Sequence, residues 1–156
     1  MLKLGKQVET ALMALKDLSE NPGGVSISFI AEKNSLSKNT LSKLMQTLMN
    51  KSFLVSAQGV KGGYKLLRPI NEISFFDLLL ALDEIKPLTC TTDLGCVLED
   101  QCSIKSPLRL WEKRFLDFLR ETTIEDLTFE QAVKTTDDAD VIINAFDANS
   151  LESRSL

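Results

Sequence analysis

The sequence contains no histidine among its 156 residues, and it has only three cysteines, one tryptophan and one tyrosine. Histidine is the side chain that most often moves protons in enzymes, and it is a frequent base beside a nucleophilic serine or cysteine. The chain also lacks a phosphate-binding glycine motif and a recognisable pair of catalytic carboxylates. These absences argue against an enzyme and against a small-molecule substrate.

Long apolar runs are missing as well. No stretch reaches the roughly 18–20 apolar residues of a membrane span, so we expect no membrane partner. Residues 1–6 lack the apolar core of a secretory signal, which predicts a cytoplasmic protein. In that reducing compartment an odd, clustered set of cysteines is more often metal-binding or redox-active than disulfide-bonded.

The net charge of −4 conceals a division of charge along the chain. Residues 1–69 hold ten lysines and arginines against four acidic residues, a balance of +6. The remaining residues hold eight basic and eighteen acidic side chains, a balance of −10. Phosphate binding responds to local charge, so a nucleic acid would meet the N-terminal half. The alternative is a solvated basic face without a partner.

Helical patterns separated by tight turns fill the N-terminal third. Apolar residues recur every three or four positions over residues 8–18, which predicts a first helix. Ser28 could cap a short helix over 29–33, and Ser37 could cap a longer helix over 38–50. Two such helices joined by a tight turn form the helix-turn-helix arrangement of DNA-binding proteins.

A β-hairpin is expected directly after this unit. Residues 53–57 and 64–67 are typical of strands, and the polar, glycine-rich stretch 58–63 between them is typical of a turn. A hairpin in this position is a wing, and its glycines would let the tip pass close to a phosphate backbone. A further helix is predicted over 73–82, with Ser74 as its cap.

Polar side chains on the helix over 38–50 and in the hairpin are the candidate DNA contacts. In a helix-turn-helix, the N-terminal part of the second helix faces the base edges of the major groove. The amide of Asn39 could pair with adenine, and Lys38 or Lys43 could contact guanine or a phosphate. The alternative is an ordinary solvated helix. The full candidate set is Lys38, Asn39, Thr40, Ser42, Lys43, Lys61, Lys65 and Arg68.

A long amphipathic helix is predicted to begin at Ser106 and Pro107, a serine cap followed by proline. It lies far along the chain from the first core, so its apolar stripe needs a partner, which a twofold-related copy would supply. The stripe consists of Leu108, Trp111, Phe115, Phe118 and Leu119. We therefore expect a homodimer. Residues 132–156 are acidic and rich in serine and asparagine, which predicts a disordered tail.

Three cysteines, Cys90, Cys96 and Cys102, lie within thirteen residues. Thiolates are strong ligands for soft metals, and these three can converge on one centre if the loop wraps around it. Their spacing differs from the Cys-x2-Cys pairs of zinc ribbons and bacterial ferredoxins. Three structural cysteines and a lone zinc ion are the alternatives. A fourth ligand would be an oxygen, and the candidates are Glu9, Asp93, Glu99 and Asp100.

Several of these stretches together resemble the Rrf2 family of bacterial winged-helix regulators, which has IscR-like and NsrR-like branches. The resemblance covers residues 9–15, the hairpin residues 59–66, the cysteine triplet and residues 122–127. It implies a homodimer held by the long C-terminal helix, with the two recognition helices reading a pseudo-palindrome. It also implies that the three cysteines are the ligands of an iron–sulfur cluster.

Departures from the family pattern concern the fourth ligand and the wing. Lys105 stands where IscR-like members have a histidine ligand, and a charged ammonium cannot ligate. In the NsrR-like branch the fourth ligand is an acidic residue on the first helix of the opposite subunit, and Glu9 is the matching position. Gln58 replaces an arginine that is common before the first wing glycine, so that DNA contact is either lost or moved to Lys61.

The sequence thus predicts a mainly α fold with a small β-hairpin wing. It divides into a winged helix-turn-helix domain (1–82), a cysteine-containing loop (83–105) and a dimerisation helix with a following segment (106–131). The predicted function is a DNA-binding repressor whose operator affinity is controlled by an iron–sulfur cluster that senses nitric oxide, redox state or iron–sulfur supply. The alternatives are a regulator with a cluster-free thiol or zinc switch, and a protein-binding adaptor.

Overall fold

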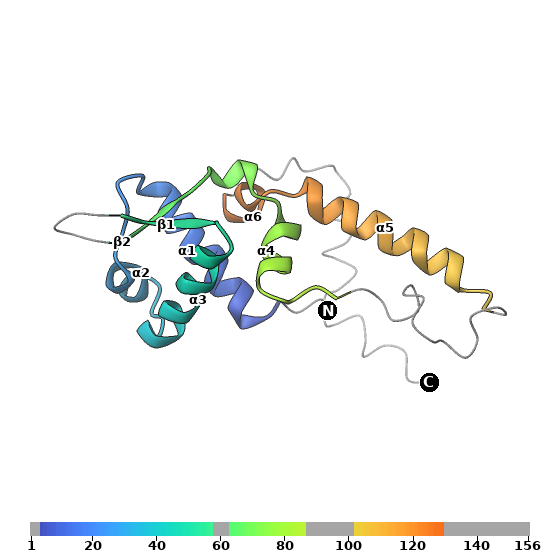
Figure 1. Ribbon diagram of the computed structural model, residues 1–156, viewed down its shortest axis with the longest axis horizontal. Helices are drawn as coiled ribbons and strands as arrows, with labels where there is room; N and C mark the ends of the chain where they lie inside the picture. The colour runs from blue at the N-terminus through green and yellow to red at the C-terminus, as the bar shows by residue number, and fades with distance from the viewer. Residues whose placement is uncertain (1–3, 58–62, 87–101, 130–156) are drawn as a thin grey trace, which may run out of the picture.

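The computed structural model describes residues 4–57, 63–86 and 102–129. Figure 1 shows a bundle of short helices with a two-stranded hairpin extending from one end and a long helix, α5, projecting from the other. The elements in chain order are α1 (Lys6–Glu20), α2 (Ile27–Lys33), α3 (Lys38–Asn50), β1 (Leu54–Ala57), β2 (Gly63–Leu66), the 3-10 turn η1 (Ile70–Glu72), α4 (Phe75–Ala81), α5 (Lys105–Glu121) and α6 (Ile124–Thr128). This is the predicted mainly helical fold with a hairpin.

The hydrophobic core is built around α1. This helix extends two residues beyond each end of the predicted range 8–18. Apolar side chains at helical spacing form one continuous face, and burying such a face is the main force that holds a short helix in place. The buried apolar residues of α1 and α3 are Val8, Ala11, Ala14, Leu15, Leu18, Leu41, Leu44, Met45 and Leu48.

The turn between α2 and α3 is tight. Ser35 adopts a left-handed conformation with φ of 53°, and the Leu36 N–H donates to the Ala31 carbonyl at 2.8 Å. The predicted bounds of α3, 38–50, are confirmed, although the Ser37 side chain makes no capping hydrogen bond. The two helices therefore form the expected helix-turn-helix.

The start of α2 differs from the prediction. Ser26, and not Ser28, is the N-cap, because its side chain accepts a hydrogen bond from the Phe29 N–H at 3.2 Å. Val25 is held by a β-bridge to Tyr64, so the chain leaves extended structure at that point and enters the helix two residues earlier than predicted.

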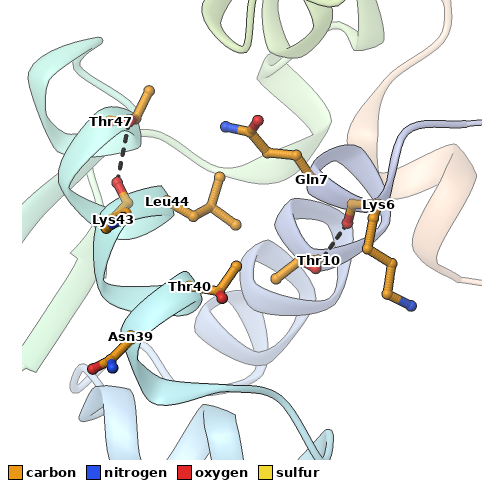
Figure 2. A pocket seen from close by; sticks show the side chains of 8 residues that line it. All are labelled: Lys6, Gln7, Thr10, Asn39, Thr40, Lys43, Leu44 and Thr47. Atoms are coloured by element: carbon orange, nitrogen blue, oxygen red, sulfur yellow. Dashed lines mark hydrogen bonds between the residues drawn. The ribbon is translucent and has the colours of Figure 1, made fainter.

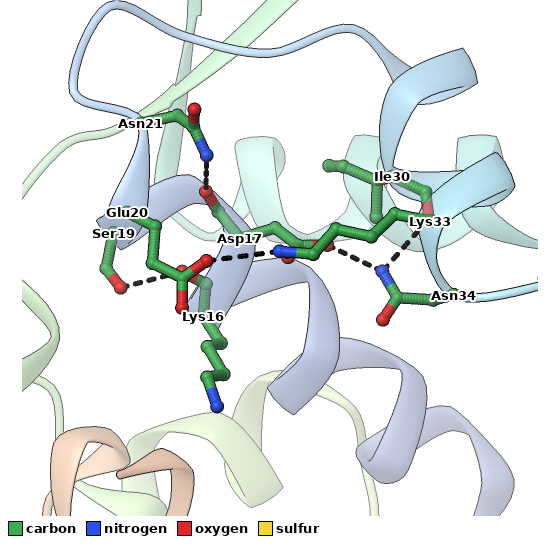
Figure 3. Close-up of polar contacts among 8 residues, drawn as sticks. All are labelled: Lys16, Asp17, Ser19, Glu20, Asn21, Ile30, Lys33 and Asn34. Carbon is green, nitrogen blue, oxygen red and sulfur yellow. Dashed lines mark hydrogen bonds and ion pairs between the residues drawn. The ribbon is translucent and has the colours of Figure 1, made fainter.

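A buried carboxylate ties α2 to α1. Asp17 is 2% exposed, and its two oxygens accept hydrogen bonds at 2.5 Å from the Lys33 ammonium and the Asn34 amide (Figure 3). Lys33 also reaches Glu20 at 3.1 Å. The pKa of Lys33 is raised above its usual 10.5, chiefly by the hydrogen bond to Asp17 and then by the one to Glu20. The end of α2 and the following turn are thereby fixed in orientation.

The hairpin has a third extended partner, which lies beside the turn end of β2. β1 and β2 pair antiparallel, with Leu54 opposite Leu66, and Tyr64 exchanges both backbone hydrogen bonds with Val25, at 2.9 and 3.1 Å. A Cβ on Gly63 would lie 2.2 Å from the Val25 carbonyl oxygen. Only glycine permits this close approach, so Gly63 sets how the wing joins the domain.

The predicted cap of α4 is confirmed, whereas α5 begins earlier than expected. Ser74 accepts a hydrogen bond from the Asp77 N–H at 3.0 Å. At α5 the Leu108 N–H donates to the Ile104 carbonyl at 3.0 Å, so Ile104 is the N-cap and Ser106 is already helical. Pro107 fits there because the first turn of a helix needs no internal N–H donor.

After α5 the chain returns to the first core. The Phe75 N–H donates to the Thr122 carbonyl at 2.7 Å, and α6 packs against α1 and η1. Thr123 and Asp126 form a capping box at the start of α6. Hydrogen bonds from the Thr123 side chain and then its backbone N–H lower the pKa of Asp126 below its usual 3.8. Ile124 is fully buried, so this return segment shares the core of the winged-helix unit.

Candidate nucleic-acid interface

The outer face of α3 carries the predicted reading residues, and the structure divides them into two groups. Lys38 and Ser42 are already engaged. The Lys38 ammonium pairs with Glu32 on α2 at 3.3 Å, and the Ser42 hydroxyl donates to the Lys38 carbonyl at 2.8 Å. A hydroxyl bonded to its own helix in this way has no proton left to donate to a base.

Asn39, Thr40 and Lys43 form the second group. All three are exposed, and within the described residues their side chains have no hydrogen-bonding or ionic partner. Figure 2 shows Asn39 directed away from the body of α3. The structure therefore presents an amide, a hydroxyl and an ammonium on one exposed helix surface, which is the donor and acceptor inventory needed to contact base edges and phosphates.

The candidates near the wing behave differently from one another. Lys65 on β2 is partly exposed and has no partner among the described residues. Arg68 is held in place by Asp77 at 3.5 Å and by the Glu72 carbonyl at 3.4 Å, and its guanidinium lies 5.8 Å from the centre of the Phe53 ring. Lys61 lies outside the described residues. Arg68 is thus a brace at the base of the wing.

A cleft of about 480 Å³ lies between α1 and α3, next to the exposed face of α3 (Figure 2). Gln7 and Thr10 on α1 face Thr40 and Leu44 on α3 across it. The sequence prediction missed the α1 wall, because its residues lie some thirty positions before the recognition helix. The described residues that line the cleft are Lys6, Gln7, Thr10, Asn39, Thr40, Lys43, Leu44 and Thr47.

The apolar stripe of α5 is largely uncovered. Trp111 and Phe118 are 56% and 62% exposed, and the rings of Trp111 and Phe115 stack with centroids 5.5 Å apart. Ile104, which the prediction did not include, extends the stripe by one turn and is 56% exposed. Leu119 is buried in the core of its own protomer, so it is not part of the uncovered surface.

Of the seven candidate metal ligands, the structure describes Cys102 and Glu9; Asp93, Glu99 and Asp100 lie outside the described residues. Cys102 is half-buried and precedes α5 by three residues. Glu9, on the first turn of α1, has a side chain 42% exposed and paired with Lys6 at 3.3 Å. Cys90 and Cys96 lie outside the described residues. The described ranges contain no group of three potential metal ligands, and they do not test convergence of the three thiols.

Sequence comparison relates the chain to transcriptional regulators. The model of the Rrf2 family, described as an iron-dependent transcriptional regulator, matches residues 4–130. An HTH-type transcriptional regulator of Synechocystis sp. is 30% identical over 132 residues, which cover 83% of this chain and 89% of that protein. Among the described residues, no helix has the length and apolar character of a membrane span.

Solved structures with the same fold include CymR, the global cysteine regulator of B. subtilis. It is 28% identical, with a TM-score of 0.64, and the match covers 82% of this chain and 97% of that one. IscR of T. potens is 26% identical, with a TM-score of 0.62 and coverage of 81% and 85%. CymR of Staphylococcus aureus is also 26% identical, with a TM-score of 0.59 and coverage of 84% and 98%.

Proposed function

The chain belongs to the Rrf2 family of transcriptional regulators, and we propose that it is a cytoplasmic, homodimeric repressor whose grip on operator DNA is set by an iron–sulfur cluster. Members of this family are not enzymes, in agreement with the absence of histidine. The single observation that carries the DNA-binding part is the exposed surface of α3, where Asn39, Thr40 and Lys43 have no partner within the described residues.

Operator recognition in this proposal depends on α3 and the wing. Asn39 can donate and accept a pair of hydrogen bonds with adenine, and Lys43 can reach guanine or a phosphate. Lys38 joins them if it exchanges Glu32 for a phosphate, because such exposed pairs contribute little to stability. Lys61 and Lys65 on the wing neutralise backbone charge, whereas Arg68 acts mainly by bracing the wing.

Dimerisation is proposed to use the exposed stripe on α5. Its tryptophan and phenylalanines are large apolar groups that water solvates poorly, and a second copy of the same helix would cover them. A twofold dimer would present two α3 helices to two half-sites about one DNA turn apart, which is the arrangement that a pseudo-palindromic operator requires. DNA reading would then be the role of residues 1–82, sensing that of residues 83–105, and dimerisation that of residues 106–131.

The sensor part of the proposal rests on the donor set. Cys90, Cys96 and Cys102 supply three soft thiolates, and the chain has no histidine to complete the set. Glu9 is accessible at 42% exposure, and it would have to leave Lys6 to ligate. When bound, an iron–sulfur cluster supplies a centre that reacts with nitric oxide or oxidants. In this proposal, damage to the cluster would release the loop that carries the three cysteines.

A cluster-free thiol switch is the second candidate. The match to CymR of B. subtilis, described as the global cysteine regulator, covers 97% of that chain and favours a role in which thiols themselves report the signal. The two candidates differ in one measurable property. A cluster gives a coloured protein with iron and sulfide, whereas a thiol switch gives a colourless protein with titratable thiols.

Anaerobic purification followed by an absorption spectrum and by iron and sulfide analysis tests the sensor. We expect a coloured wild type, and we expect Cys96→Ala to lose the colour while it remains a folded dimer. A colourless, iron-free wild type would overturn the cluster and leave the thiol switch; bound zinc alone would indicate a zinc site.

Gel shifts on the DNA upstream of the protein's own gene test the proposed DNA contacts of α3 and the wing. Asn39→Ala should relax sequence preference, with a loss of about 1–3 kcal/mol that is confined to the operator. Lys65→Gln should instead weaken binding to all duplexes alike. An unmodified preference in Asn39→Ala would contradict the assignment of α3 as the reading helix.

A further inference from the structure

The cleft between α1 and α3 adjoins the reading face described above. Asn39, Thr40 and Lys43 belong to both, because they lie on the exposed side of α3 and also line the cleft. The opposite wall comes from the first turns of α1, where Lys6 and Gln7 stand (Figure 2). A DNA duplex that contacts the exposed side of α3 would therefore contact this wall as well.

The hydrogen-bonding capacity of the cleft is mostly that of donors. The hydroxyls of Thr10 and Thr47 are satisfied within their own helices, by the Lys6 carbonyl at 2.8 Å and the Lys43 carbonyl at 3.1 Å. In the part of the chain that the structure describes, the side chains of Gln7, Thr40 and Lys43 have no partner. Among the described residues, no carboxylate lines the cleft. Unused donors from two helices, without a competing carboxylate, suit an anion.

Lys6 stands at the outer rim of the cleft. Its side chain is 82% exposed, and its one ionic partner in the described part of the chain is Glu9, three residues further along the same helix, at 3.3 Å. An exposed pair of this kind contributes little to stability, and salt screens it. A phosphate that arrives at the rim therefore competes with Glu9 at small cost, and Lys6 can turn to it.

We infer that this cleft receives a phosphate of the operator backbone, which makes the N-terminal turn of α1 a third DNA-contacting element beside α3 and the wing. Lys6 and Gln7 hold the phosphate from α1, while Thr40 and Lys43 hold it from α3. The inference rests on the proposed function, since it requires that α3 lies in the groove.

A phosphate within a duplex fits this site better than a free anion. The ammonium groups of Lys6 and Lys43 are both exposed to water. Attraction between charges is weak in water, so these two groups alone would bind a free anion weakly. A backbone phosphate is delivered by the many other contacts of the duplex and need not bind by itself.

The salt dependence of DNA binding tests this contact. Lys6→Gln removes one phosphate contact from each protomer of the dimer, so it should reduce the slope of log Kobs against log salt by about 1.8, and equally so for operator and unrelated duplex. Its affinity deficit relative to wild type should then be about 12-fold larger at 50 mM than at 200 mM salt. Gln7→Leu should lower affinity with the slope unchanged, because it removes a donor without a charge.

Lys16→Gln is the matched control, because it removes the same charge from the other end of α1, where the ammonium lies 5.0 Å from the centre of the Phe129 ring. Its slope should equal that of wild type, and thermal melts should show all variants folded. Ethylation of single phosphates gives an independent readout: at one phosphate in each half-site, ethylation should weaken wild type more than Lys6→Gln.

Two results would overturn the inference without touching the proposed function. One is operator binding by Lys6→Gln with an unchanged slope. The other is stabilisation of wild type, but not of Lys6→Gln, by inorganic phosphate in thermal melts together with that unchanged slope, which would make the cleft a free-anion site. By contrast, a wild type without operator preference would refute the proposed function itself.

Discussion

The head of the molecule, formed by α1 to α4 and the hairpin, and the projecting helix α5 differ in how much of their apolar surface is buried within the protomer. Four of the thirteen residues of α3 are buried, whereas α5 buries only Leu119 among its seventeen. Most of the apolar surface of α5 faces water, as Trp111 and Phe118 show. The head therefore folds around its own core, while α5 is anchored at its C-terminal end and otherwise depends on what covers it.

One chain can therefore have two kinds of apolar face, one that stabilises the fold of the protomer and one that is left for association. In the head, each buried side chain removes its surface from water within the protomer, and the gain goes to folding. On α5, the gain is available only on association. Substitutions of similar chemistry should therefore have opposite consequences in the two regions, and the following changes test that, ranked by their effect on the free energy of unfolding.

The largest effect is expected in the core of the head. Leu15→Ala removes a side chain that is fully buried on α1, and it should lower the free energy of unfolding by about 2–5 kcal/mol. Urea denaturation monitored by circular dichroism measures this. A loss below 1 kcal/mol, roughly the value for a surface site, would show that α1 is not the centre of the core.

Next comes the buried carboxylate between α1 and α2. Asp17→Asn weakens the hydrogen bonds to Lys33 and Asn34 and should cost about 1–3 kcal/mol. Because the pKa of Lys33 is raised in the fold, its contribution is complete below pH 10.5 and is lost as pH rises through the folded value. Wild type should thus destabilise in that alkaline window more than the variant. Parallel alkaline profiles would refute the pairing.

A smaller effect is expected at the return segment. Thr123→Ala removes the capping box of α6 and should cost about 1 kcal/mol. The pKa of Asp126 is lowered by this box, so its contribution is present above pH 3.8 and fades as pH falls through the folded value. NMR titration of Asp126 should show its pKa moving upward in the variant. An unmoved pKa would contradict the geometry of the cap.

The smallest effect on the fold is expected on α5. Phe118→Ser lies on the exposed stripe, so the unfolding free energy of the isolated protomer should change by less than about 0.5 kcal/mol. Association should nevertheless be lost, as sedimentation velocity would show. Lys113→Ser, on an exposed position outside the stripe, is the control and should leave the dimer intact. A dimeric Phe118→Ser would remove the stripe from the interface.

Local signals predicted the head well. The helix over 38–50, the hairpin and the cap at Ser74 were correct, because apolar period, turn residues and caps act over a few neighbouring positions. The exposed polar residues of α3 followed from the same helical period. The sequence could not show that Ser42 and Lys38 are already engaged, since their partners depend on side-chain conformations and on the packing of α2.

Long-range packing accounts for what the sequence did not predict. Leu119 has the same period as the exposed stripe, but it lies in the core where α5 packs against α4. Ser26 became the cap of α2 because Tyr64, far along the chain, pairs with Val25. The α1 wall of the cleft and the partners of Asp17 likewise arise where distant segments meet.

The attachment of α5 has a mechanical consequence. Seventeen helical residues make a stiff arm about 25 Å long. Its far end is clamped through Thr122, and its near end begins just after Cys102. On an arm of this length, a displacement of about 2 Å at the cysteine end is a tilt of about 5° at the clamp. Under the proposed function, a chemical change at Cys102 would therefore alter the angle between α5 and the winged-helix unit.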